Sequence, residues 1–305
     1  MSAIGFDTSN YTTSIAFFDG NDGVNCSRLL PVKQGELGLR QSDAVFSHTK
    51  SLPELSGRLF SHVQNPNVDV IGVSTRPRAV EGSYMPCFMV GYSHAKLLAD
   101  ALGKPLVEVS HQQGHVAAAL WSAGRLDLMD QAHLAWHLSG GTTELLLVEP
   151  SGERIIRAGI LGGSTDISAG QLIDRAGVAL EMPFPAGPYV EQAALKSDKN
   201  DYFRVKVQGC SFSFSGVQNQ FEARIKAGES REDICRFVLL TVAEAILKAT
   251  RNARKTYPLP VLISGGVSVC SLVQDVFAKE KDLWFAQKGL GGDNAVGTAI
   301  LASMR

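Results

Sequence analysis

Short apolar runs separated by turn residues predict two β-hairpins of one design. The first hairpin covers residues 3–18 and has Asp7-Thr8-Ser9 at the start of its polar turn. The second covers residues 132–148 and turns at Ser139-Gly140-Gly141-Thr142-Thr143. Gly, Asn, Asp and Ser between apolar runs are typical of such turns. Two hairpins of the same outline, about 130 residues apart, indicate a duplicated domain.

The rest of the chain alternates between helical and strand patterns. Apolar residues at helical spacing predict helices, and short apolar runs predict strands between them. Such alternation predicts an α/β fold with mainly parallel pairing. We expect an N-terminal α/β domain over residues 1–130, against which a last helix at 293–305 packs back, and a C-terminal α/β domain over residues 131–292. The helices are expected at residues 89–102, 167–180, 232–255 and 293–304, and the strands at 68–74, 106–109 and 260–263.

Composition narrows the class of protein without naming a partner. The chain has 305 residues, above the size at which one core keeps growing, which agrees with two domains. Its 29 basic and 30 acidic residues give a net charge of −1, so the overall charge does not require a nucleic-acid partner. Five scattered cysteines without a C-x-x-C pair argue against a disulfide framework and a zinc knot and predict a cytoplasmic location. No leader and no long apolar span is expected, hence no membrane partner.

Two histidines are the strongest chemical signal. His111 and His115 are four residues apart, after a short strand and with Ser110 as a helix N-cap. At this spacing two imidazoles lie on one helix face and can bind one metal ion. Asp293, which follows two glycines, is the simplest third ligand. The alternative is an ordinary pair of helix histidines that cap or pack.

Glycine turns predict a phosphate site. Backbone amides approach phosphate closely where glycine follows a strand, as in the turns Ser139-Gly140-Gly141 and Ser264-Gly265-Gly266. His137 precedes the first turn by two residues, which places it near the predicted pocket or leaves it as an ordinary strand histidine.

Two further residues have open interpretations. Asp174, on the helix that carries Gly170, is either a ribose ligand or a surface carboxylate beside Arg175. Cys270 is either a catalytic thiol or, more in keeping with its type, a small buried filler. Neither a Ser-His-Asp set nor a Walker loop is present.

These segments, taken together, resemble one family over nearly the whole chain: the tRNA threonylcarbamoyladenosine transferases, formerly called glycoproteases or O-sialoglycoprotein endopeptidases, which belong to the actin/Hsp70/sugar-kinase fold class. The matching stretches are Gly5-Phe6-Asp7-Thr8-Ser9, Glu81-Gly82-Ser83-Tyr84, Gly91 to Leu98, His111-Gln112-Gln113-Gly114-His115, Ser139-Gly140-Gly141, Asp166 to Asp174, Pro185-Ala186-Gly187-Pro188, Phe212-Ser213-Phe214-Ser215-Gly216, Ser264-Gly265-Gly266-Val267 and Asp293-Asn294-Ala295.

The resemblance implies a set of roles. One metal, iron or zinc, would be held by His111, His115 and Asp293, with His137 as a further ligand where some members carry tyrosine. ATP or an adenylate would be bound, with Mg as an additional candidate ion. The family moves a threonylcarbamoyl group from its adenylate to N6 of adenosine 37 in tRNA, with the metal as Lewis acid. The residues that the resemblance assigns to the nucleotide are Ser139, Gly140, Gly141, Thr142, Thr143, Gly170, Asp174, Gly187, Glu191, Gly265, Gly266 and Cys270.

Departures from the family pattern define the hypotheses. Neutral Tyr11, Gln113 and Gln171 stand where the family carries acids, and Cys270 stands for asparagine. An amide does not move protons as an acid does, which suggests a diverged paralogue. The first hypothesis is therefore a carbamoyl-type transferase, not a protease, that acts on tRNA with family partner proteins or as a homodimer. The alternatives are a non-catalytic nucleotide-binding partner protein and an ATPase or carbamoyltransferase acting on another acceptor.

Overall fold

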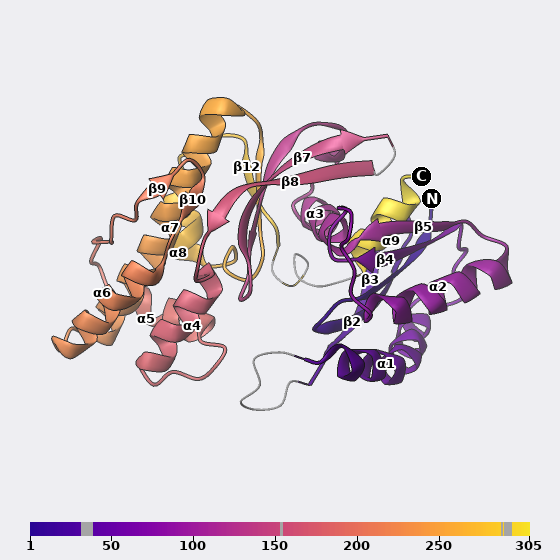
Figure 1. Cartoon of the computed structure of the whole chain (residues 1–305), viewed down its shortest axis with the longest axis horizontal. Coiled ribbons are helices and arrows are strands. Elements are labelled where there is room, and N and C mark those ends of the chain that lie inside the picture. Colours follow the sequence, from indigo (N-terminus) through magenta and orange to yellow (C-terminus); the bar gives the residue numbers. More distant parts are fainter. Residues whose placement is uncertain (32–38, 153–154, 288, 290–294) are drawn as a thin grey trace. The chain divides into compact units, whose positions relative to one another are not determined.

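A computed structural model describes residues 1–31, 39–152, 155–287, 289 and 295–305 (Figure 1). Contacts divide these residues into two compact units, each described by itself. Unit 1 comprises residues 1–130, 150–158 and 290–305, and unit 2 comprises residues 131–149 and 159–289.

Unit 1 is built on a mixed β-sheet. Among the described residues its strand order is β3-β2-β1-β4-β5. The hairpin strands β1, β2 and β3 pair antiparallel, whereas β4 and β5 continue the sheet parallel to β1. The strands are β1 (Ala3–Thr8), β2 (Thr12–Phe18), β3 (Gly23–Leu29), β4 (Val70–Arg76) and β5 (Leu106–Ser110).

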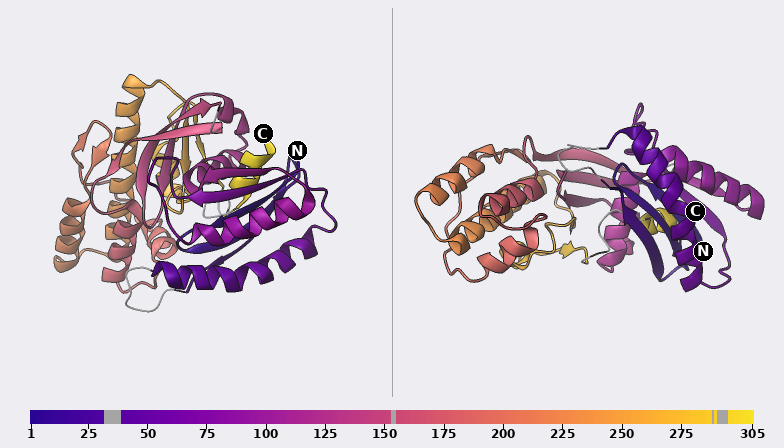
Figure 2. Two further views of the ribbon diagram at one scale, coloured as in Figure 1. Left: turned by 45° about the vertical axis from the view of Figure 1, so that its right-hand side comes forward. Right: turned by 90° about the horizontal axis from the view of Figure 1, so that it is seen from below.

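Helices cover both faces of this sheet. Alternate residues of a strand point to opposite faces, so Ile4 and Phe6 pack in a core with helices α1 and α2, while Gly5 between them faces α9. A Cβ atom on Gly5 would overlap the backbone of Ala295, and one on Gly72 would lie 2.6 Å from the carbonyl oxygen of Thr298. These glycines let α9 approach the strands closely. The helices of unit 1 are α1 (Gln41–His62), α2 (Phe88–Leu102), α3 (His111–Ser122), the 3-10 turn η1 (Leu126–Asp130) and α9 (Val296–Ser303) (Figures 1 and 2).

Unit 2 repeats the strand order of unit 1. Its described sheet runs β12-β11-β6-β7-β8-β10-β9. If β6 is numbered as the first strand of the repeat, both units have the order 3-2-1-4-5, with β10 and β9 added beyond β8. As in unit 1, the first hairpin is antiparallel, and β11 and β12 follow in parallel. The strands are β6 (His133–Leu138), β7 (Thr143–Ser151), β8 (Ile155–Ser164), β9 (Val207–Gln208), β10 (Ser211–Phe212), β11 (Val261–Ser264) and β12 (Leu283–Phe285).

The long helix α7 (Arg231–Thr256), orange in Figure 1, supplies much of the core of unit 2. Apolar side chains recur along it at helical spacing, and the indole nitrogen of the buried Trp136 donates to Thr250 Oγ1 over 2.8 Å. The other helices are α4 (Ala169–Ala179), α5 (Gly187–Ala194), α6 (Ser215–Lys226) and α8 (Ser271–Val276). Within the described residues, no helix combines the length and apolar character needed to span a membrane.

The duplicated α/β architecture is confirmed, and most predicted elements match it within a few residues. The hairpin makes one neighbour of β1 and of β6 antiparallel and the other neighbour is parallel, while farther along the sheet of unit 2 β10 pairs parallel with β8.

Candidate functional site

A capping box begins helix α3 and positions both imidazoles. Ser110 Oγ accepts from the backbone amide of Gln113 over 3.2 Å, and the Gln113 side chain accepts from the amide of Ser110 over 2.8 Å. This reciprocal pair makes His111 the first helical residue. His115 follows one turn later, and the two Nε2 atoms are 2.9 Å apart.

The carboxylate of Asp7 holds His111 from the other side. Asp7 lies in β1, only 2% exposed, and accepts from His111 Nδ1 over 2.8 Å. Ser74, in the neighbouring parallel strand β4, donates its hydroxyl to the same carboxylate. Because a carboxylate only accepts, neutral His111 carries its proton on Nδ1 and directs the lone pair of Nε2 toward His115.

This arrangement fits a divalent metal. Ligand histidines commonly donate their second ring nitrogen to a carboxylate, which fixes the tautomer and raises the basicity of the ligand atom. Two converging Nε2 atoms would supply two ligands to zinc or iron. Among the described residues, no group of three or more His, Cys, Asp or Glu side chains is arranged so that all of them could bind one metal ion. The predicted third ligand, Asp293, lies outside the described residues.

Sequence reasoning missed the role of Asp7. The sequence placed Asp7 only at the start of a polar hairpin turn, whereas the structure directs its carboxylate to His111. The available signal was an acidic residue in the first strand, whose neighbour β4 is parallel, because the carboxyl ends of parallel strands share one edge of a sheet.

A buried histidine braces the same turn. His48, on α1, is fully buried; its Nε2 lies 2.9 Å from the carbonyl oxygen of Ser9 and its Nδ1 2.8 Å from Thr13 Oγ1. The carbonyl can only accept, so neutral His48 donates from Nε2 and accepts the Thr13 hydroxyl proton at Nδ1. Burial lowers the pKa of His48, which favours this neutral form.

Both Ser-Gly-Gly turns emerge at one edge of the unit 2 sheet. Strands β6 and β11 are parallel neighbours, with His137 opposite Ser264 in register. The amide of Val267 donates to the carbonyl of Leu138 over 3.0 Å, which joins the two turns. Gly265 has φ +97°, and a Cβ atom there would overlap the Leu138 carbonyl oxygen. Only glycine fits this position, while Gly266 is exposed and faces open space.

The first of these turns docks on the N-terminus of α4. Ser168, the N-cap of α4, donates its hydroxyl to the carbonyl of Gly140 over 2.7 Å. A Cβ atom on Gly170 would lie 2.7 Å from both Gly140 Cα and the Ser139 carbonyl oxygen, so glycine is required there. Gly140 and Gly141 are exposed, and nothing lies within 4 Å of a Cβ atom on either. Open backbone beside a helix N-terminus is suited to an anion.

Other predicted nucleotide residues have structural partners in unit 2. Thr143 Oγ1 accepts from the amide of Ala169 over 2.7 Å and so holds the start of α4. Thr142 donates its amide to Ser139 Oγ over 3.0 Å, within the turn itself. Asp174 accepts from the amide of Ala186, directly before Gly187 and α5, over 2.8 Å.

Glu191 and Cys270 lie together at the start of α8. Glu191 accepts from both the amide and the hydroxyl of Ser271 over 2.7 Å. Cys270 is the N-cap of α8, and burial raises the pKa of its thiol to about 12. A thiol with such a pKa stays protonated at neutral pH, which argues against a nucleophilic role and for the buried filler.

The structure explains two of the three replaced acids. Gln113 is 3% exposed and donates its amide nitrogen to the carbonyl of Ile156 over 2.7 Å, a bond that an ionised glutamate has no proton to make. Gln171 completes the capping box of α4 with Ser168. Gln serves a capping box as well as Glu. Tyr11 is 46% exposed and bonds through its carbonyl to the amide of Leu30.

Comparison with known proteins decides the family. The family model described as tRNA N6-adenosine threonylcarbamoyltransferase, TsaD, matches residues 38–299. The chain belongs to this family. Curated relatives of the same name include one from Archaeoglobus fulgidus, 28% identical over 300 residues and covering 96% of this chain and 88% of the relative. Another, from Thermus thermophilus, is 29% identical over 317 residues, covering 100% of this chain and 93% of the relative.

Solved structures agree on the fold of this TsaD-family chain. Full-length HypF, in its phosphate- and nucleotide-bound form, has a TM-score of 0.59 at 12% identity, with 99% of this chain covering 55% of HypF. A ROK hexokinase from Thermus thermophilus has a TM-score of 0.53 at 15% identity, and the match covers both chains almost fully, 100% and 98%. The fold is therefore that of the actin/Hsp70/sugar-kinase class.

Proposed function

We propose that this chain moves a threonylcarbamoyl group from its adenylate to N6 of adenosine 37 in tRNA. The proposal rests on family membership and, within the structure, on one observation: the hydrogen-bonded series Asp7, His111, His115 at the start of α3. A non-catalytic relative has no need for two converging imidazoles fixed by a buried carboxylate.

His111 and His115 would hold the metal, iron or zinc, with Asp293 as the proposed third ligand and His137 as a further candidate. When bound, the metal would supply Lewis-acid chemistry at the carbamoyl-phosphate unit. Asp7 and Ser74 orient His111, so they act as positioning residues. His48 does the same for the turn that carries Asp7.

The adenylate would bind in unit 2. The exposed amides of Gly140 and Gly141, beside the N-terminus of α4, would receive phosphate oxygens. The open backbone at Gly266 would lie against the base. Asp174 and Glu191 accept hydrogen bonds at the starts of α5 and α8. We therefore assign both residues two roles: they order the loops around the ribose, and they bind the ribose hydroxyls. ATP, with Mg as an accompanying ion, is the other nucleotide that such turns suit.

In the transfer itself, the exocyclic amine of the adenosine attacks the carbonyl carbon of the threonylcarbamoyl group. A carbon–nitrogen bond forms, the carbon–oxygen bond to phosphate breaks, AMP leaves and the amine loses a proton. The non-catalytic alternative loses support, because Gln113 and Gln171, which stand where the family carries acids, cap helices here. An acceptor other than tRNA is the second candidate function, and the transfer assay distinguishes it.

A reconstituted transfer assay tests the proposal. The full chain is incubated with threonylcarbamoyl-adenylate and unmodified tRNA, with and without the family partner proteins of its own organism, and the nucleosides are read by mass spectrometry. We expect modified adenosine with the unaltered chain and at least a 100-fold lower rate with His111→Ala, roughly the cost of losing a ligand or its support. His62→Ala, an exposed histidine of α1, is the matched control and should leave the rate unchanged.

Two results would overturn the proposal. If His111→Ala still forms product at the normal rate, the imidazole pair is not needed for the reaction. No product from a protein that still binds adenylate and metal would exclude tRNA as the acceptor.

A further inference from the structure

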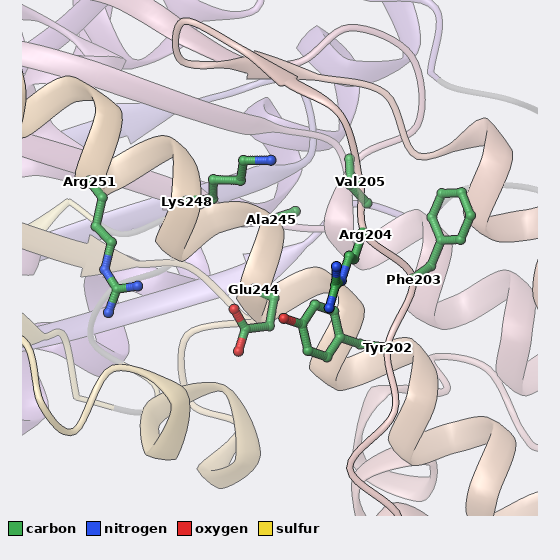
Figure 3. A pocket seen from close by; sticks show the side chains of 8 residues that line it. All are labelled: Tyr202, Phe203, Arg204, Val205, Glu244, Ala245, Lys248 and Arg251. Carbon is green, nitrogen blue, oxygen red and sulfur yellow. The ribbon is translucent and has the colours of Figure 1, made fainter.

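A pocket lies beside helix α7, and neither Ser-Gly-Gly turn contributes to its lining. It holds about 210 Å³ between α7 and the segment before β9 (Figure 3). This volume is below the roughly 300–1,000 Å³ of sites for drug-sized ligands, so it suits one small unit of a larger molecule. The lining residues are Tyr202, Phe203, Arg204, Val205, Glu244, Ala245, Lys248 and Arg251.

The walls of the pocket are held in place by hydrogen bonds. The amide of Phe203 donates to Thr241 Oγ1 over 3.0 Å, and Asn252 donates its side-chain amide to the carbonyl of Gly209 over 2.9 Å. Val205 is 5% exposed. Both ends of the 203–209 segment are therefore tied to α7, and the pocket is preformed.

Two of the cationic side chains in the pocket have no ion-pair partner among the described residues. Glu244, Lys248 and Arg251 follow one another at helical spacing on one face of α7. Arg251 is paired with Glu280 over 2.8 Å. In contrast, the side chains of Arg204 and Lys248 make no ion pair or hydrogen bond with any residue that the structure describes. Two exposed cations thus remain available beside Tyr202, which is 38% exposed.

The carboxylate of Glu244 decides which anion fits. Glu244 lines the pocket together with Tyr202 and Arg204 (Figure 3). A carboxylate repels a compact dianion such as free phosphate, but it accepts hydrogen bonds from hydroxyl groups. A singly charged phosphodiester next to a ribose 2′-hydroxyl satisfies both the cations and Glu244, and an aromatic ring beside them suits a base or sugar. DNA lacks the hydroxyl.

We propose that this pocket binds the ribose-phosphate backbone of RNA, with Arg204 and Lys248 on phosphate and Glu244 on a 2′-hydroxyl. The inference rests on the proposed function, which supplies tRNA as the substrate, and adds a backbone contact outside the reacting centre. Such contacts fix the register of a nucleic acid without reading its sequence.

The test is tRNA binding by the full chain, measured by fluorescence anisotropy at about 50 to 200 mM salt, the range over which phosphate contacts change affinity strongly. We expect the double variant R204Q/K248Q to bind unmodified tRNA about tenfold more weakly at low salt, with a salt slope shallower by about 1–2. Thermal unfolding should be unchanged, because both side chains are exposed and unpaired within the described structure. K226Q/R231Q, which removes two exposed cations elsewhere in unit 2, is the matched control and should stay within twofold.

A second variant tests the hydroxyl contact. E244Q should lower the preference for RNA over DNA of the same sequence roughly threefold. Inorganic phosphate is added as a competitor to distinguish a free small anion from RNA.

Three results would overturn the inference: equal losses in R204Q/K248Q and the control, tRNA affinity that no variant changes, or displacement of tRNA by micromolar inorganic phosphate. The transfer assay shows whether a negative result contradicts the RNA-binding pocket or the proposed transfer reaction. Transfer that persists while R204Q/K248Q binds tRNA normally rejects the pocket alone, and pocket-dependent binding without transfer rejects the reaction alone.

Discussion

Helices α3 and α4 begin with the same Ser-x-x-Gln capping box, yet the turns beside them are built in opposite ways. In unit 1 the end of β1 carries side chains with partners, because Asp7 is 2% exposed and accepts a hydrogen bond from His111. In unit 2 the turn after β6 exposes Gly140 and Gly141 as bare backbone. One repeat therefore presents side chains at this position, and the other presents amides.

The difference separates two kinds of chemistry on one duplicated scaffold. Side chains held by buried hydrogen bonds suit a metal, because ligand atoms need fixed direction. Open glycine backbone beside a helix N-terminus suits phosphate, because partial positive charge and close approach are enough. Substitutions that act on one side of this contrast should therefore leave the other side intact.

The largest effect is expected when each of the two capping glutamines is replaced by glutamate, because the two variants should differ most in their free energy of unfolding. Gln113→Glu places a carboxylate against the carbonyl of Ile156 in a buried site, so the free energy of unfolding should fall by about 2–4 kcal/mol. Gln171→Glu, at the exposed equivalent, should change it by less than about 0.5 kcal/mol, because a Glu also completes the box. Urea unfolding of both variants measures this. Equal losses would show that burial does not distinguish the two boxes.

Gly170→Ala should damage unit 2 at the phosphate turn. Its Cβ atom would lie 2.7 Å from the backbone of Gly140, so either the turn or α4 must move. We expect a loss of about 1–3 kcal/mol in unfolding free energy and at least tenfold weaker ATP binding by calorimetry. Gly141→Ala is the matched control for stability, since nothing lies within 4 Å of its Cβ atom. If both variants unfold alike, the close packing of Gly170 has no energetic importance.

Asp7→Asn should weaken metal binding while the fold survives. The amide donates where the carboxylate accepted, so His111 loses the partner that fixes its tautomer. We expect roughly 10–100-fold lower affinity for zinc, measured by competition with a chelating dye. Asp22→Asn, an exposed hairpin carboxylate, should bind zinc normally. If Asp7→Asn binds zinc with unchanged affinity, Asp7 does not support the metal site.

His48 predicts a pH dependence of stability. Burial lowers the pKa of folded His48, so the unfolded chain binds more protons as pH falls below about 6.5. The free energy of unfolding should therefore be highest above that pH and fall below it, by up to about 1.4 kcal/mol per pH unit, until the folded pKa is reached. His48→Gln should remove this part of the slope, and exposed His62→Gln should keep it. Identical profiles for all three proteins would contradict the assignment.

Sequence periodicity predicted much of the fold because each pattern has a local cause. Helix α7 spans Arg231–Thr256, and the prediction was 232–255. The two agree because the apolar stripe of the helix and its N-cap Ser230 are local features of the sequence. The two antiparallel hairpins followed from their turn residues, whereas the short strands β9 and β10, which extend the sheet of unit 2 beyond β8, were not predicted.

The site was predictable where its residues are adjacent in sequence and not where they meet through the fold. His111 and His115 follow from spacing alone. The bond from Asp7 to His111 joins residues 104 positions apart, and the donor role of Gln113 depends on a strand that passes near it. An amide read as a lost acid proved to be a buried donor, a distinction that only the position of Ile156 supplies.

Helix α9 also sets the order in which the molecule is completed during synthesis. Its glycine-lined contacts reach β1, β4 and α3, and every residue from Val296 to Ala302 is buried. About 290 residues separate it from β1. At roughly 5–20 residues per second, the ribosome delivers it some 15–60 s after the first strand. Until then, Gly5 of β1, Gly72 of β4 and Gly114 of α3 lack the helix that covers them in the folded chain.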